Sequence, residues 1–194
     1  MKPLREKLGG GAAVKGTMLQ AHLAWAAQRL GPDWKARLRP HLDAGAAASV
    51  DRDVLATEWV PLARLVQIDR AIAREAGGAP ERAFGELGRQ SATVNLGSVY
   101  KAFVPDEPHT FFEQMAFLHD RFMNFGRCAY ERSGPRSGRI RMEGYPEYSP
   151  VFCVSATGYY EGALLMMHVP GPVVVREIAC QCAGDEACVF EMAW

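Results

Sequence analysis

The chain has 194 residues, which is enough for one domain with a sizeable core. Its 22 Lys and Arg residues balance its 22 Asp and Glu residues, so charge gives no argument for binding nucleic acid or an anionic membrane surface. Residues 1–8 lack the apolar segment of a signal peptide, and no run reaches the ~18 apolar residues of a membrane span. We therefore expect a cytoplasmic protein whose five cysteines are reduced.

The first two thirds of the chain have a helical pattern. Residues 1–14 are charged and rich in glycine, which predicts a flexible lead, and we expect residues 15–194 to form a single domain whose part 15–126 is mainly helical. Residues 43–49 have the small side chains of a linker. The predicted helices cover residues 18–30 with Thr17 as N-cap, 34–42, 57–77, 80–103 and 108–125. The small residues at 85, 88, 92 and 97 either weaken their helix or mark a close helix crossing.

The helix predicted over residues 108–125 is the most aromatic part of the chain. Its apolar residues cover much of the circumference, as in an element buried on more than one side. Such a helix either lines a ligand cavity or forms ordinary core, and the pattern leaves both open. We expect His109 and His119, on the same segment, to be capping or surface groups.

From residue 127 onward the pattern changes to strands. Residues 128–132 and 138–144 predict a hairpin, residues 151–167 a helix, and residues 173–179 and 187–192 two further strands. The order strand-strand-helix-strand-strand predicts a four-stranded antiparallel sheet covered by helices. The fold class is therefore α+β.

Four of the five cysteines lie in the final part of the chain, together with one carboxylate in the strand at 173–179. Folding the last two strands about Gly184 brings Cys180 opposite Cys188, close enough for two thiolates to share one tetrahedral Zn²⁺. Glu177 is the third predicted ligand, and it requires a bulge before Cys180 because their spacing of three is odd. Cys153 is the fourth. A site closed by four protein ligands predicts structural rather than catalytic zinc.

Three alternatives to this zinc site remain open. Cys182 in place of Glu177 would give a four-cysteine site. The cysteines could instead be reduced, buried thiols, or a disulfide if the protein were exported.

The residues of this region resemble a known family. Cys153, the segment Ala-Thr-Gly-Tyr-Tyr-Glu-Gly at 156–162 and the run Glu177-x-x-Cys180-x7-Cys188 are similar to the 4-vinyl-reductase-type domain, above all to the N-terminal sensor domain of aromatic-responsive bacterial activators. The resemblance implies that Cys153, Glu177, Cys180 and Cys188 hold a structural zinc, and it implies a homodimer. Lys15-Gly16-Thr17 resembles related haem nitric-oxide sensors and TRAPP subunits, and residues 58–62 resemble uncharacterised myxobacterial members.

These observations predict a non-catalytic sensor domain with a structural zinc and an apolar pocket. The pocket would bind a hydrophobic or aromatic small molecule, and a protein partner would receive the signal. One alternative is a dimeric protein-protein interaction scaffold of the TRAPP type, and a second is a reductase or accessory protein of tetrapyrrole synthesis. The chain contains no phosphate-binding loop, G-x-S-x-G motif or dinucleotide fingerprint. The predicted ligand-contacting residues are Phe112, Met115, Phe122 and Tyr159.

Overall fold

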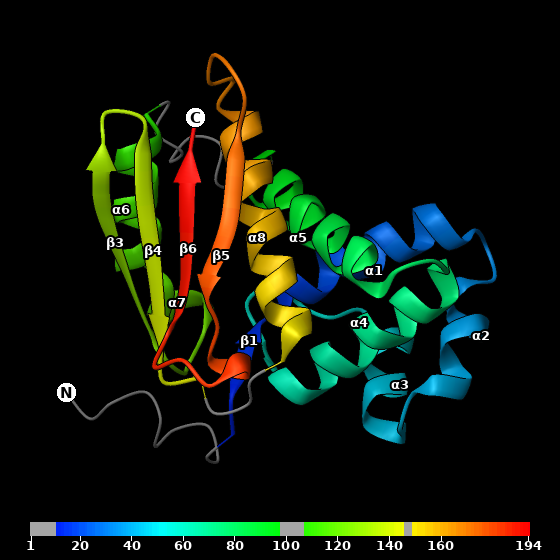
Figure 1. Ribbon diagram of the computed structural model, residues 1–194. Coiled ribbons are helices and arrows are strands. Elements are labelled where there is room, and N and C mark those ends of the chain that lie inside the picture. Colours follow the sequence, from blue (N-terminus) through cyan, green and yellow to red (C-terminus); the bar gives the residue numbers. More distant parts are fainter. Residues whose placement is uncertain (1–10, 98–106, 146–148) are drawn as a thin grey trace.

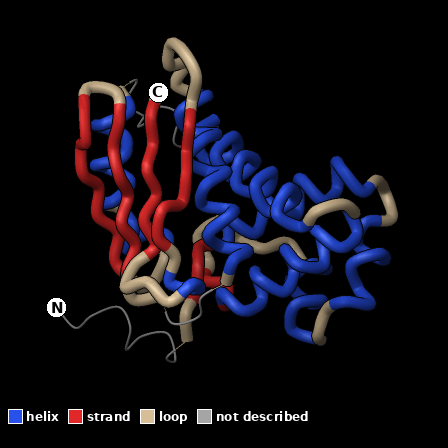
Figure 2. Tube along the Cα trace, viewed as in Figure 1, coloured by secondary structure: helices blue, strands red, loops and turns tan. Residues whose placement is uncertain are grey.

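The computed structural model describes residues 11–97, 107–145 and 149–194. A four-stranded sheet lies beside a group of helices, with α8 (Pro150–Met166) between the two (Figures 1 and 2). The helical group contains α1 (Gly16–Leu30), α2 (Trp34–Leu38), a 3-10 turn (Arg39–His41), α3 (Ala44–Asp51), α4 (Leu62–Ala76) and α5 (Pro80–Gly97). The short strands β1 (Ala13–Lys15) and β2 (Trp59–Pro61) pair antiparallel at its base.

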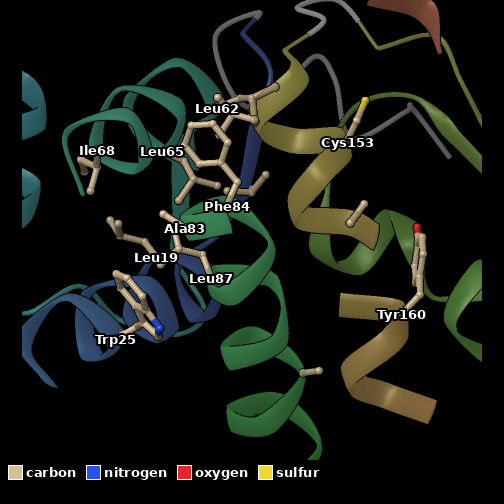
Figure 3. Close-up of a cluster of buried hydrophobic side chains, with 14 of the residues drawn as sticks. Leu19, Trp25, Leu62, Leu65, Ile68, Ala83, Phe84, Leu87, Cys153 and Tyr160 are labelled. Atoms are coloured by element: carbon tan, nitrogen blue, oxygen red, sulfur yellow. The ribbon is translucent and has the colours of Figure 1, made fainter. Parts of the chain in front are cut away.

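The helical group has its own apolar core. Leu19 and Trp25 of α1 pack toward Leu65 and Ile68 of α4 and Leu87 of α5 (Figure 3). These positions follow helical spacing, so each helix turns one apolar stripe to the others. In α4 the buried residues Leu62, Leu65, Ile68 and Ile72 form this stripe.

The sheet has the strand order β3-β4-β6-β5, and all neighbours are antiparallel. Its strands are β3 (Arg127–Gly134), β4 (Ser137–Glu143), β5 (Val174–Ala179) and β6 (Cys188–Ala193). Alternate residues are buried: Ile140 and Met142 of β4, and Cys188, Phe190 and Met192 of β6. Because successive side chains of a strand point to opposite faces, one face of the sheet packs against α6 (Pro108–Phe117) and α8. The α+β class and the four-stranded antiparallel sheet are confirmed.

Helices α5 and α8 cross at very short range. A Cβ on Gly88 would lie 1.9 Å from the Ser155 carbonyl oxygen, and one on Gly158 would lie 2.1 Å from the Gly85 carbonyl oxygen. Glycine is therefore required at both positions, because a side chain would push the backbones apart. Of the two interpretations of the small residues in α5, the close crossing is the right one.

Several predicted boundaries are wrong. Residues 43–49 are no linker, because Asp43 accepts a hydrogen bond from Ala46 N at 2.7 Å and caps α3. Residues 59–61 form β2 rather than the first turn of a helix. Thr17 does not cap α1, which begins at Gly16. Ala13, counted in the predicted lead, belongs to β1.

The aromatic helix is also divided differently from the prediction. It breaks at Leu118 into α6 and the short α7 (His119–Phe122). Glu107 caps α6 by accepting hydrogen bonds from the backbone N–H groups of His109 and Thr110 at 3.1 and 2.7 Å. The last part of the helix predicted over residues 80–103 lies outside the described residues.

Candidate functional site: a thiol–carboxylate cluster and an apolar cavity

Four predicted ligands converge where α8 meets the end of the sheet. Cys153 lies in the first turn of α8, Glu177 in β5, Cys180 directly after β5 and Cys188 at the start of β6. One donor atom from each lies within 4.8 Å of every other. Cys153 Sγ is 3.8 Å from Cys180 Sγ and 3.6 Å from Cys188 Sγ. Thiolates on a tetrahedral metal ion with metal–sulfur bonds of about 2.3 Å lie about 3.8 Å apart. The spacing therefore suits one ion.

Local backbone features produce this convergence. The register between β5 and β6 shifts between Glu177 and Ala179, which is the irregularity that the odd spacing of Glu177 and Cys180 requires. After β5 the chain makes a 3-10 turn (Gln181–Ala183) and reverses at Gly184, whose φ of 99° is left-handed. Asp185 Oδ2 accepts a hydrogen bond from Cys180 N at 2.7 Å, and Cys188 Sγ accepts one from Gln181 N at 3.4 Å.

The cluster's electrostatics favour a cation. Burial, followed by the charge of Glu177, raises the pKa of the Cys153 thiol, and burial raises the pKa of the Cys188 thiol. Glu177 Oε1 is buried and has no hydrogen-bond partner within the described parts of the chain. A carboxylate oxygen buried in this way is costly unless a cation or a donor compensates it.

The alternatives for the cysteines can now be compared with the geometry. All five cysteines are free, so none forms a disulfide. Glu177, rather than Cys182, completes the set of donors, and Cys182 is exposed on the 3-10 turn. Partial burial and neighbouring Cys180 raise the pKa of Cys182 to about 11, so its thiol stays protonated at neutral pH.

A cavity of about 180 Å³ lies between the helices and the sheet. Its wall is mostly apolar and includes Met18 of α1, Ser91 and Asn95 of α5, Met115 of α6, His119 and Phe122 of α7, Cys128 of β3, Met142 of β4, and Ala156, Tyr159 and Tyr160 of α8. Helix α8 thus carries both Cys153 of the cluster and Tyr160 of the cavity wall (Figure 3).

Three of the four predicted ligand-contacting residues line this cavity, namely Met115, Phe122 and Tyr159. Phe112 does not. It is fully buried in the core, stacked on Tyr130 with ring centroids 5.6 Å apart and edge-on to Tyr160 at 6.1 Å.

The two histidines are buried, contrary to the prediction of capping or surface roles. His109 Nδ1 lies 2.6 Å from the Tyr130 hydroxyl and Nε2 lies 3.1 Å from the Pro135 carbonyl oxygen. His119 lines the cavity, its Nε2 lies 3.2 Å from the Tyr145 hydroxyl, and burial lowers its pKa. In the continuous helix predicted over residues 108–125, Met115, His119 and Phe122 fall at i, i+4 and i+7 on one face. This spacing is the signal that would have placed His119 on the cavity face, although the helix in fact breaks at Leu118.

Ser91 is a second lining residue that the sequence did not reveal. It lies among small residues of α5, where serine is compatible with any close helix crossing. Nothing in the local pattern distinguishes a serine that faces a cavity from one that faces a neighbouring helix.

Comparison with known proteins gives matches among solved structures only. No model of a known protein family matches the chain, and no curated protein matches it. An H-NOX protein from S. oneidensis in the Fe(II)NO ligation state matches with a TM-score of 0.71 and 13% identity, over 92% of this chain and 97% of that one. An unliganded Fe(II) H-NOX mutant from K. algicida matches with a TM-score of 0.69 and 8% identity, over 92% and 95%. The chain therefore has the fold of H-NOX proteins.

A third match comes from work on how protein-induced porphyrin distortion modulates haem redox potential. Its TM-score is 0.68 and its identity 13%, over 93% of this chain and 99% of that one.

Two predictions are corrected by these comparisons. The 4-vinyl-reductase-type domain is wrong as the principal assignment, because the matching structures are H-NOX proteins, which the sequence analysis named only as relatives. Zinc is wrong as the expected cofactor, because the matching structures are of proteins that contain haem or a ligated Fe(II).

The homodimer was implied only by the resemblance to the 4-vinyl-reductase-type domain and loses its basis with it. The TRAPP-type scaffold and the reductase of tetrapyrrole synthesis were drawn from the same group of resemblances and gain no support. Every helix in the described ranges is too short or too polar to cross a bilayer.

The cavity does not fit a haem. Its volume of about 180 Å³ is close to the roughly 150 Å³ of a cavity that holds a single benzene ring, and a haem is several rings larger. His119 lines the wall, but its Nε2 already has the Tyr145 hydroxyl at 3.2 Å. The fold is thus shared with haem proteins, whereas the space inside it is suited to a smaller molecule.

Proposed function

We propose that the chain is a non-catalytic sensor domain that binds a small apolar molecule in the cavity between α6, α7 and α8. The observation that carries this proposal is the apolar cavity of about 180 Å³. A dry engineered cavity of about 150 Å³ lined by aliphatic and aromatic residues binds benzene or xenon. The cavity here is therefore suited to one aromatic ring or a body of equal size, in contact with Met115, Phe122 and Tyr159.

The position of the cavity supports a sensing role. Its wall combines the short helix α7, which follows the break at Leu118, with α8, which is anchored at the cluster end by Cys153. A ligand that fills the space stabilises the arrangement of α7 against α8, and a protein partner that binds this arrangement would transmit the signal.

Ligand-induced stabilisation tests the proposal. We expect toluene to raise the melting temperature, whereas haemin gives no shifted Soret band and no stabilisation. Met115→Trp, which fills the cavity, and Phe122→Ala, which opens its wall, should both weaken the toluene effect. Phe117→Ala is the matched control, because Phe117 is adjacent to the cavity residues but 86% exposed. Failure of toluene and other single-ring compounds to stabilise the folded wild type would exclude the proposed function, and a haemin complex would replace it with haem binding.

We also propose that Cys153, Glu177, Cys180 and Cys188 bind one thiophilic metal ion with a structural role. The support is the common distance of their donor atoms and the buried, unpartnered Glu177 Oε1. Such an ion would join α8 to the last hairpin. It would also lower the pKa of each cysteine thiol that it binds, since a metal-bound thiol is deprotonated. Elemental analysis of the purified protein, with Cys182→Ser as control, measures the occupancy. A metal-free protein of full stability would exclude the site.

A further inference from the structure

Ser91 is a buried polar residue of the cavity wall. It lies on α5, the residue is 3% exposed, and its hydroxyl has no hydrogen-bond partner in the described chain. A serine within a helix ordinarily bonds the carbonyl four residues earlier, and Ser49 of α3 does so with Gly45 O at 3.0 Å. Ser91 lacks this bond. Because a buried hydroxyl without a partner is unfavourable, the site calls for a compensating group.

Three other polar groups of the wall have hydrogen-bond partners. Thr17 Oγ1 donates to Asn95 Oδ1 at 2.8 Å, and the Tyr160 hydroxyl donates to Met142 Sδ at 3.2 Å. Lys15 Nζ donates to the Thr57 carbonyl at 2.8 Å. Among the buried hydroxyls that line the cavity, counting only residues that the structure describes, Ser91 Oγ is the one without a bond.

We propose that Ser91 is the specificity-determining residue of the cavity and that it hydrogen-bonds one polar atom of the ligand. This inference rests on the proposed function and narrows its ligand class. The ligand is an apolar body of about one ring that carries a single hydroxyl or carbonyl, because a serine hydroxyl both donates and accepts. A cavity of this kind discriminates strongly against an analogue without the polar atom, since Ser91 then stays unpaired.

Two probes of equal size test the proposal: benzyl alcohol and ethylbenzene, which differ by a hydroxyl in place of a methyl group. The measured quantity is the ratio of their dissociation constants, Kd of ethylbenzene over Kd of benzyl alcohol, in each variant. We expect Ser91→Ala to lower this ratio about tenfold. Ser91→Cys, close in size and a weaker donor, should give an intermediate ratio and serves if the alanine variant folds poorly.

Ser49→Ala is the matched control, because Ser49 is equally buried but lies in α3, away from the cavity. We expect it to leave the ratio unchanged. Binding of both probes with the same ratio in wild type and in the Ser91 variants would overturn the role of Ser91 and leave the proposed function intact. Binding of neither probe to the wild type would overturn the proposed function and this inference with it.

Discussion

The crossing of α5 and α8 determines the width of the cavity, because both helices contribute to its wall. Gly158→Ala perturbs this crossing directly. The added Cβ would lie 2.1 Å from the Gly85 carbonyl oxygen, whereas ordinary contacts begin near 3.4 Å. The obstacle is backbone and has no rotamer to change, so α8 must withdraw by about 1 Å. Overpacking of this kind costs about 1–3 kcal/mol.

Gly85→Ala is the matched control at the same crossing. A Cβ there meets only the guanidinium of Arg89, at 3.8 Å, which is an ordinary van der Waals contact. Replacing glycine by alanine within a helix stabilises it by up to about 1 kcal/mol. The two variants should therefore differ in free energy of unfolding by about 2–4 kcal/mol, with opposite signs relative to wild type.

Urea unfolding followed by circular dichroism measures this difference, and the toluene-induced rise in melting temperature reports the cavity in the same variants. We expect Gly158→Ala to lose both stability and toluene binding, and Gly85→Ala to keep both. Equal stability of the two variants would show that the helices do not approach as closely as described and would refute the reasoning.

Three further predictions concern the cluster, the cavity histidine and a helix cap. Glu177→Gln should lower the bound metal per chain in elemental analysis, whereas Cys182→Ser should not, because Cys182 lies outside the four donors; equal losses would place Cys182 in the site. Burial lowers the pKa of His119 below 6.5, so as pH falls the unfolded chain binds the proton before the folded chain does. The wild type should therefore lose stability as pH falls below about 6.5, and His119→Gln should lose less. Urea titrations at several pH values measure this difference. Asp43→Ala should cost about 1 kcal/mol of unfolding free energy by removing the cap of α3, and an unchanged urea midpoint would contradict that role.

The strands and α8 could be predicted because their signals are local. Alternation in 138–144 and 187–192 and the proline at the start of α8 specify those elements without reference to the rest of the chain. The short strand β2 could not be found in this way. Its three residues extend because they pair with β1, about 45 positions earlier, and a proline near an apolar stripe looked like the first turn of α4.

The linker predicted over residues 43–49 failed for a different reason. Alanine is the best helix former, yet a run of alanine and glycine has no apolar stripe to mark a helix, so the capping role of Asp43 was the only remaining signal.

The candidate site was partly predictable. The cluster was found because cysteine and glutamate carry their chemistry in their identity, and the structure places their donors together. The cavity face was harder to predict, because Phe112 and Met115 lie on one helix whose apolar residues cover much of its circumference. Only packing decides that Met115 meets the cavity while Phe112 enters the core against Tyr130.

Methionine methyl NMR tests the central claim, ligand binding in the cavity, most directly. Met18, Met115, Met123 and Met142 line the cavity, while Met192 is buried in the sheet outside it. Titration of methyl-labelled protein with toluene should shift the signals of the four lining methionines saturably and leave Met192 unaffected. Signals that stay in place throughout the titration, or that move only at Met192, would contradict a ligand site between α6, α7 and α8.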